Sequence, residues 1–100
     1  MRSLAELLAP TQTETPYGGQ VTSYEILGLA WLAVGPRQMR ERTEEGLGRS
    51  FETLEARVRT DLRLTEGRIL RFGGADWTIR QTDPDADRPG RAMLKLERRR

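Results

Sequence analysis

A pair of glycines, Gly73-Gly74, separates two short runs of alternating apolar and polar residues in the last third of the chain. Residues 68–72 precede the pair and residues 75–80 follow it. Two such runs joined by two glycines are typical of a tight β-hairpin, because glycine adopts the positive φ angles of the favoured turns without strain. Alternation with a period of two puts every second side chain on one face. This region therefore predicts paired strands, with Trp77 and its alternate neighbours facing a core.

The same alternation recurs elsewhere in the chain. It is found in residues 11–15, 20–26, 53–60 and 92–97, and the turn signal Pro16-Tyr17-Gly18-Gly19 separates the first two runs. The pattern predicts five or six short strands and no long helix. Closure removes exposed sheet edges. We therefore expect a mainly β, single domain over residues 1–100, built as a small, SH3-like, closed or nearly closed β-barrel.

Residues 29–34 are apolar at every position, between Gly28 and Gly35-Pro36. A run that is apolar on both faces is typical of a strand covered on both sides. Such a strand lies either deep in the fold or at a contact between subunits. We interpret Trp31, like Trp77, as a core residue.

Two segments fit more than one structure. Residues 51–64 match an amphipathic helix by the spacing of Phe51 and Leu54, but residues 53–60 also alternate as a strand, which we favour. Residues 3–6 have the spacing of a helix capping box, and Pro10 would end a helix begun there. The fold therefore contains at most one short helix at the N-terminus, unless that end is extended.

Residues 37–50 are polar and charged, and we predict that they form one long loop. A long loop in so short a chain is usually either functional or simply solvated. The functional alternative is a loop that points into a partner or a pore. Its charged residues are Arg37, Arg40, Glu41, Arg42, Glu44, Glu45 and Arg49.

The composition argues against most enzymes and metal sites. The chain has no cysteine and no histidine, which removes the commonest metal ligands and the usual general base. Asp83, Asp85 and Asp87 have the alternating spacing of a calcium loop, but Arg88 occupies the position that requires glycine. We therefore predict no catalytic residues, no cofactor and no metal.

Charge and hydropathy limit the partners. The net charge is +2, and removing the three C-terminal arginines (Arg98, Arg99 and Arg100) leaves −1 for residues 1–97. A balanced body with a basic tail does not suit a protein that coats DNA. No apolar run reaches the length of about 20 residues that a membrane span needs, so we expect no membrane partner and synthesis in a cytoplasm.

The order of several motifs resembles the tailed-phage head-tail joining proteins, also called head completion or stopper proteins. The resemblance covers about residues 11–97. Its N-terminal part consists of Tyr17-Gly18-Gly19, Tyr24, Trp31, Val34 and Pro36, and its C-terminal part is the hairpin sequence of residues 68–79.

The resemblance implies a structural connector in the neck of a phage-like capsid, assembled in a bacterial cytoplasm. The subunit would form a homo-oligomeric ring of about six or twelve copies, with the portal and adaptor proteins on the head side and a tail terminator on the other. The loop at residues 37–50 would then face the central channel and help to retain packaged double-stranded DNA. Residues 98–100 would contact DNA or a neighbouring ring. The strong arginine bias, with Lys95 the single lysine among 17 basic residues, also suits a gene transfer particle of a GC-rich bacterium.

Two other functions are open. An SH3-like or OB-like barrel would bind nucleic acid through Arg57, Arg59, Arg71 and Arg80. An enzyme is the weakest alternative, because the chain offers no convincing pair of catalytic groups.

Overall fold

The protein is built entirely of antiparallel strands in the part of the chain that is described. The computed structural model describes the backbone of residues 2–44 and 47–99, and the side chains of these residues except 42–44, 47, 49 and 99. The strands are β1 (Arg2–Glu14), β2 (Gln20–Val34), β3 (Gln38–Glu44), β4 (Leu47–Arg59), β5 (Ile69–Phe72), β6 (Ala75–Pro84) and β7 (Arg91–Arg99). The mainly β prediction is confirmed, with seven strands rather than five or six.

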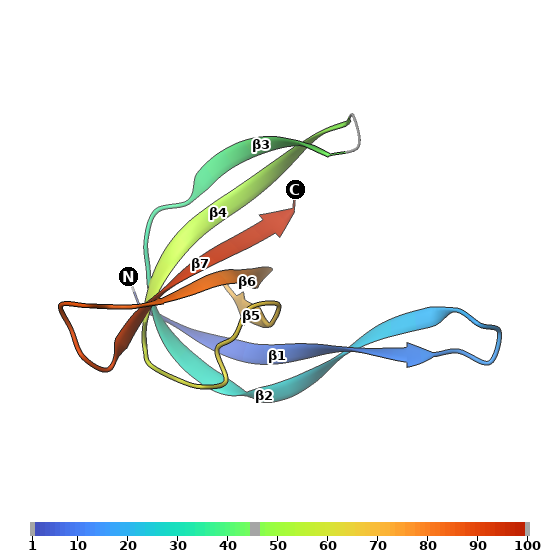
Figure 1. Ribbon diagram of the computed structural model, residues 1–100, viewed down its shortest axis with the longest axis horizontal. Helices are drawn as coiled ribbons and strands as arrows, with labels where there is room; N and C mark the ends of the chain where they lie inside the picture. The colour runs from blue at the N-terminus through green and yellow to red at the C-terminus, as the bar shows by residue number, and fades with distance from the viewer. Residues whose placement is uncertain (1, 45–46, 100) are drawn as a thin grey trace.

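The single sheet closes on itself into a barrel-like ring. The strand order is β2-β1-β5-β6-β7-β4-β3, and a further ladder joins β2 to β4 through Ala33↔Arg57 and Val34↔Ala56. Figure 1 shows the two longest hairpins, β1–β2 and β3–β4, extending beyond the ring on the right of the view. The ring therefore forms a compact base from which two ribbons project.

Alternation along the strands produces the core, as predicted. In β4, Leu54, Ala56 and Val58 are buried, and in β7 they lie opposite Leu96, Leu94 and Ala92. The core also contains the side chains of Ala5, Leu7, Leu32, Leu64, Leu70, Phe72, Trp77 and Ile79. Residues 51–59 are thus a strand and the helical alternative is wrong, because β7 pairs with β4 from Phe51 to Arg59.

The short helix suggested by the capping-box spacing of residues 3–6 is also absent, because these residues belong to β1. They pair with β2 from Ser3↔Leu32 to Glu6↔Leu29, and Ala5 and Leu7 point into the core. Burial of alternate side chains against a long partner strand outweighs a local capping signal.

The prediction of a long loop at residues 37–50 is wrong. Residues 38–44 form β3, which pairs with β4 from Gln38↔Thr53 to Glu44↔Leu47. Because β4 is already fixed by β7 on one edge, its other edge is a ready template for a further strand. A strand that projects from the core needs no apolar face, so its charges do not prevent it from pairing. The channel-loop residue Glu45 lies outside the described residues.

Trp31 is not a core residue, contrary to our interpretation, whereas Trp77 is. Trp31 is 58% exposed and Leu29 is 55% exposed, while Trp77 is completely buried. The outer face of β2 has no covering element among the described residues, so only the inward side chains, such as Leu32, are shielded. Trp31 instead pairs across the sheet with the half-exposed Leu4 and lies under the Arg2 guanidinium. The alternative of a subunit contact at this strand stays a prediction.

A bulge in β2 is held by an arginine from the β4–β5 connection. The register shifts between Leu7↔Gly28 and Leu8↔Ile26, and Gly28 has a φ of 145°. Arg63 donates hydrogen bonds to the carbonyl oxygens of Leu27 (3.1 Å) and Leu29 (3.4 Å). A Cβ at Gly28 would collide with the Arg63 guanidinium. The bulge therefore requires glycine for both its conformation and its space.

Asp61 orients the guanidinium of Arg63. It accepts hydrogen bonds from the backbone nitrogen of Arg63 (2.9 Å) and from Nη2 of the same residue (2.7 Å). Hydrogen bonds from Arg63 to the carboxylate favour its charged form and hold the pKa of Asp61 below its ordinary value. This ion pair fixes the cation at the edge of β2.

The different environments of the two tryptophans predict different costs of truncation. We expect Trp31→Ala to lower the free energy of unfolding by about 0.5–1 kcal/mol, the size of an exposed cation–π contact. Trp77→Ala should lower it by about 3–5 kcal/mol, because it empties a core site. Chemical denaturation followed by circular dichroism measures both values. Equal losses would contradict the placement of Trp31 outside the core.

The Gly28 bulge predicts coupling between two positions far apart in the sequence. Gly28→Ala should lower the free energy of unfolding by about 1–3 kcal/mol through backbone strain. Displacement of the Arg63 side chain should lower it further. In a chain that already carries Arg63→Ala, the same change should cost less, since the collision has been removed. A double-mutant cycle measures the difference. The same cost in both backgrounds would show that Arg63 does not occupy this space.

Candidate functional site

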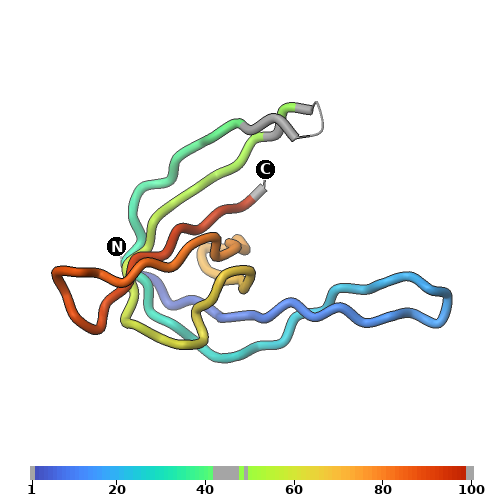
Figure 2. Tube along the Cα trace, viewed as in Figure 1, coloured from blue at the N-terminus to red at the C-terminus, as the bar shows by residue number. Residues whose placement is uncertain are grey.

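The β3–β4 hairpin carries most of the charged residues that the sequence singled out. Arg40 and Glu41 lie on β3 and are exposed, as expected for a projecting ribbon. Arg42, Glu44 and Arg49 are on the paired strands, but their side chains, like the whole of Glu45, lie outside the described residues. In Figure 2 the described part of this hairpin extends away from the ring along one side.

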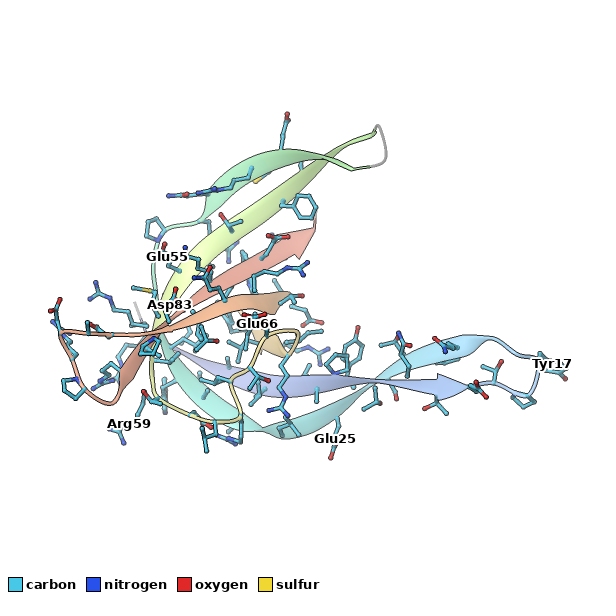
Figure 3. The ribbon with its side chains drawn as sticks, in the orientation of Figure 1. Tyr17, Glu25, Glu55, Arg59, Glu66 and Asp83 are labelled. Atoms are coloured by element: carbon cyan, nitrogen blue, oxygen red, sulfur yellow. The ribbon has the colours of Figure 1, made fainter. Side chains whose placement is uncertain are left out.

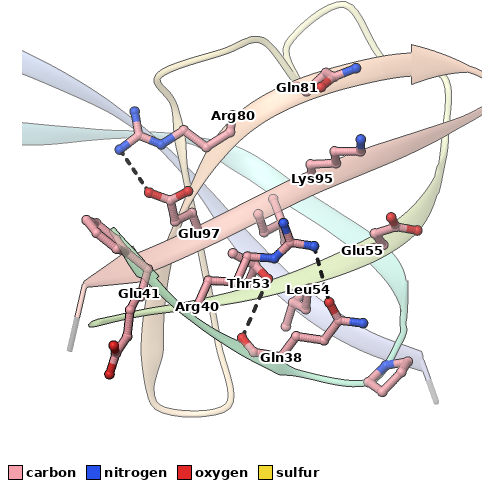
Figure 4. A pocket seen from close by; sticks show the side chains of 13 residues that line it. Gln38, Arg40, Glu41, Thr53, Leu54, Glu55, Arg80, Gln81, Lys95 and Glu97 are labelled. Atoms are coloured by element: carbon pink, nitrogen blue, oxygen red, sulfur yellow. Dashed lines mark hydrogen bonds and ion pairs between the residues drawn. The ribbon is translucent and has the colours of Figure 1, made fainter. Parts of the chain in front are cut away.

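A groove of about 520 Å³ lies between the hairpin and the outer surface of β6 and β7. Figure 4 shows basic side chains and carboxylates interspersed along it. Arg80 lies 3.6 Å from Glu97, and Arg40 donates a hydrogen bond to Gln38 at 3.5 Å. The charged residues that line the groove are Arg40, Arg80, Lys95, Glu41, Glu55 and Glu97. The groove is therefore lined by three basic and three acidic side chains, whose charges balance.

Arg37 and Arg98 do not project from the molecule, because both fold back onto its core. Arg98 donates a hydrogen bond from Nε to the Glu52 carboxylate at 2.9 Å, and Nη1 of Arg37 lies 3.9 Å from the same oxygen. Their guanidinium carbons lie 5.2 and 5.4 Å from the ring centre of Trp77. We call Arg37, Glu52, Trp77 and Arg98 the base cluster, because they lie where the β3–β4 hairpin joins the ring.

The base cluster covers one end of the core. Trp77 stacks on Phe72 with the ring centres 6.0 Å apart, and the two guanidinium groups lie against its indole. The Glu52 side chain is only 8% exposed, so its carboxylate needs such partners. Arg98, which the sequence placed in a basic tail, lies on β7 and is the partner of Glu52, and its contact with DNA or a neighbouring ring stays a prediction. The Arg99 side chain and all of Arg100 lie outside the described residues.

Sequence reasoning missed Glu52, although the pattern contained a signal for it. Position 52 has the same strand parity as Leu54, Ala56 and Val58, whose side chains point inward. A carboxylate at an inward position implies a buried cationic partner. What the sequence did not show is which of the many arginines supplies it.

The arginines of the nucleic-acid alternative do not form one free basic face. Arg71 donates hydrogen bonds to Asp76 at 2.7 and 3.1 Å, and these bonds keep the pKa of Asp76 below its ordinary value. Arg80 lies beside Glu97, as described for the groove. Only Arg57 and Arg59, both exposed on β4, have no ion pair with a described carboxylate. Half of the proposed face is therefore neutralised by carboxylates.

The aspartate-rich connection between β6 and β7 makes local contacts. Asp83 accepts hydrogen bonds from Gln81 at 2.8 and 3.0 Å, and Asp85 accepts one from the backbone nitrogen of Asp87 at 3.0 Å. The described residues contain no group of three side chains placed to hold a metal ion. They likewise contain no helix with the length and hydropathy to cross a membrane.

Comparison with known proteins gives the family. The model for the phage head completion protein family matches residues 1–98. The chain belongs to this family. The resemblance found in the sequence is thereby confirmed, and the protein is a structural component of a phage-like particle rather than an enzyme.

A solved structure supports the fold of this head completion protein. A chain in the virion of a native gene transfer agent particle superposes with a TM-score of 0.70 at 17% sequence identity, covering 97% of this chain and 93% of that one. No curated protein sequence matches the chain. At this identity the likeness shows the shared fold, and the family match carries the functional assignment.

The burial of Glu52 predicts a large difference between two glutamates of the same strand. Glu52→Ala should lower the free energy of unfolding by about 3 kcal/mol, because it leaves Arg98 beside an apolar core without its carboxylate. The control Glu55→Ala, on the outer face of β4, should change it by less than about 0.5 kcal/mol. Urea denaturation of both variants measures the difference. Similar small effects would mean that the base cluster does not stabilise the fold.

Proposed function

We propose that the protein is the stopper-type connector subunit of a phage-like particle. In this proposal a homo-oligomeric ring of about six or twelve copies joins the portal and adaptor to the tail terminator. The β3–β4 hairpin lines the channel and helps to retain packaged double-stranded DNA. Membership in the head completion family supports a place at the head-tail junction. The observation that carries the finer assignment is a charged hairpin that projects from the ring while its base is fixed in the core.

The charge pattern of this hairpin suits a channel filled with DNA. Arg40 next to Glu41 gives each subunit a cation that reaches phosphates and a carboxylate that weakens permanent binding. Cyclic symmetry multiplies such weak contacts, so retention needs no strong single site. The arginine bias and the fold shared with a chain of a gene transfer agent virion favour a domesticated particle assembled in a bacterial cytoplasm.

Shortening the hairpin tests this proposal in particles. We expect replacement of residues 41–50 by Asn-Gly, a two-residue hairpin turn between the paired residues Arg40 and Phe51, to preserve the fold and the oligomer. It should lower the amount of nuclease-protected DNA per particle severalfold. Quantitative PCR after nuclease treatment measures retention, and electron microscopy of the neck locates the protein.

The control replaces Arg88 by Ala in the β6–β7 connection and should leave DNA retention unchanged. If the shortened hairpin retains DNA as well as the control does, the channel role is wrong. Absence of the full-length protein from particle necks would reject the connector function itself.

A further inference from the structure

The β1–β2 hairpin continues beyond the ring as a two-stranded arm, which we define as residues 9–25. Its strands pair from Ala9↔Glu25 to Glu14↔Gln20. Figure 3 shows the arm running out to Tyr17 at its tip, along the molecule's longest dimension of 50 Å. At the tip the backbone nitrogen of Thr15 donates to the Gly19 carbonyl at 2.8 Å, and Gly19 donates back to the Thr15 hydroxyl at 3.0 Å. The arm is thus a closed ribbon with no core of its own.

Both edges of the hairpin are covered immediately before the arm begins. On the β1 side, β5 pairs with β1 from Glu6 to Leu8. On the β2 side, the Arg63 guanidinium donates hydrogen bonds to the carbonyl oxygens of Leu27 and Leu29. The two different covers stop at the same level, because Leu8 lies opposite Ile26.

Beyond that level both edges are open. In the described part of the chain, residues 9–14 of β1 pair with β2 alone, and residues 20–25 of β2 pair with β1 alone. Each strand therefore presents unused backbone donors and acceptors along its outer edge. A single two-stranded hairpin is only marginally stable in water, and an open edge is a template for another strand.

The arm lacks most of the devices that usually protect such an edge, although Pro10 on β1 has no backbone N–H to donate. It contains no lysine or arginine, and its two charges, Glu14 and Glu25, lie at opposite ends. Its strands are instead rich in β-branched residues such as Thr11, Thr13 and Thr22. Val21 and Tyr24 are 53% and 49% exposed. The contrast with the covered edges at the ring indicates that the arm is open for pairing.

We propose that arms of neighbouring copies pair edge to edge, the outer edge of β1 in one arm with the outer edge of β2 in the next. This inference rests on the proposed connector ring and names the segment that links its subunits. The two edges are different and run in opposite directions, so each junction is antiparallel and head-to-tail. A contact of this kind, repeated by rotation, closes into a ring.

The charges of the arm are compatible with this pairing. If the register between arms follows that within an arm, Glu25 of one copy meets Ala9 of the next and Glu14 meets Gln20. The carboxylates then remain at opposite ends of each junction, so like charges are not opposed. The result is a continuous antiparallel sheet around the oligomer, made of two strands from each subunit.

Cysteine cross-linking tests the pairing directly, because the natural chain has no cysteine. Single cysteines are placed at positions 11, 12 and 13 of β1 in one set of chains and at positions 21, 22 and 23 of β2 in another. After mixing and mild oxidation, we expect disulfide-linked dimers from at least one β1–β2 combination and none from either partner alone. Cα atoms must lie within about 7 Å for a disulfide to form, so the scan also reports the register.

Other outcomes identify other occupants of the edge. Cross-links from a β2 cysteine alone, as in Thr22→Cys, would replace the head-to-tail junction by a two-fold contact. Leu62→Cys, which is 93% exposed on the ring, is the control and should not cross-link. Oligomers that form without any β1–β2 cross-link would overturn the proposal. The open edges would then be available to pair with a strand of another neck protein.

Removing the arm gives an independent test. Replacing residues 10–24 by Asn-Gly leaves the ring of strands intact, and circular dichroism checks that the variant is folded. We expect this variant to remain monomeric at concentrations at which the full chain assembles, as measured by light scattering. Assembly of the armless variant would reject the arm as the link while preserving the connector function. Failure of the full chain to assemble, or to occupy particle necks, would reject the connector function instead.

Discussion

Pairing of β4 on both of its edges is the constraint on which the rest of the structure depends. β7 follows one edge from Phe51 to Arg59. The other edge receives β3 beside the first part of β4, and then the end of β2. Between these two partners, the Gly35 nitrogen donates to the Glu55 carbonyl at 2.8 Å, so the chain crosses from β2 to β3 without leaving β4. A Cβ on Gly35 would lie 3.0 Å from that carbonyl oxygen. One strand therefore both closes the ring and supports the charged hairpin.

The base cluster joins these two tasks electrostatically. Glu52 lies on β4, Arg37 between β2 and β3, and Arg98 on β7, so the cluster links all the segments that meet where the hairpin leaves the ring. Burying a carboxylate with two arginines costs desolvation energy, so the ion pairs add little net stability. Their contribution is to favour one arrangement of β3, β4 and β7 over others. The two arginines of the cluster also cover Trp77, the largest residue of the core. The position of the hairpin is thus coupled to the packing of the core.

Sequence reasoning recovered the parts of the fold that depend on local pattern. The Gly73-Gly74 hairpin, the inward side chains of β4 and β7, and the turn at residues 16–19 follow from period-two alternation and turn chemistry. The errors concern partners that are distant in sequence. Trp31 is exposed because its outer face lacks a neighbour, and β3 forms because β4 offers it an edge. No local pattern contains either fact.

The candidate site was predicted only in part, for the same reason. Arg40 and Glu41 are exposed on the hairpin as the charge run suggested, whereas Arg37 and Arg98 are drawn back to Glu52 by the closure of the ring. An arginine that is solvated and one that lies against a buried tryptophan have the same appearance in a sequence. The tertiary partner decides between them.

That the charged segment is a paired ribbon rather than a loop changes how it would move. A loop adapts to its surroundings residue by residue, but a ribbon bonded from Gln38↔Thr53 to Glu44↔Leu47 turns as one lever. Its fulcrum is the connection at residues 35–37 and the part of β4 held by β7. Displacing the end of the hairpin at Glu44↔Leu47 would strain the contacts that Glu52 makes at its base. Conversely, a change that weakens those contacts would move that end of the hairpin, although the residues between them keep their conformation.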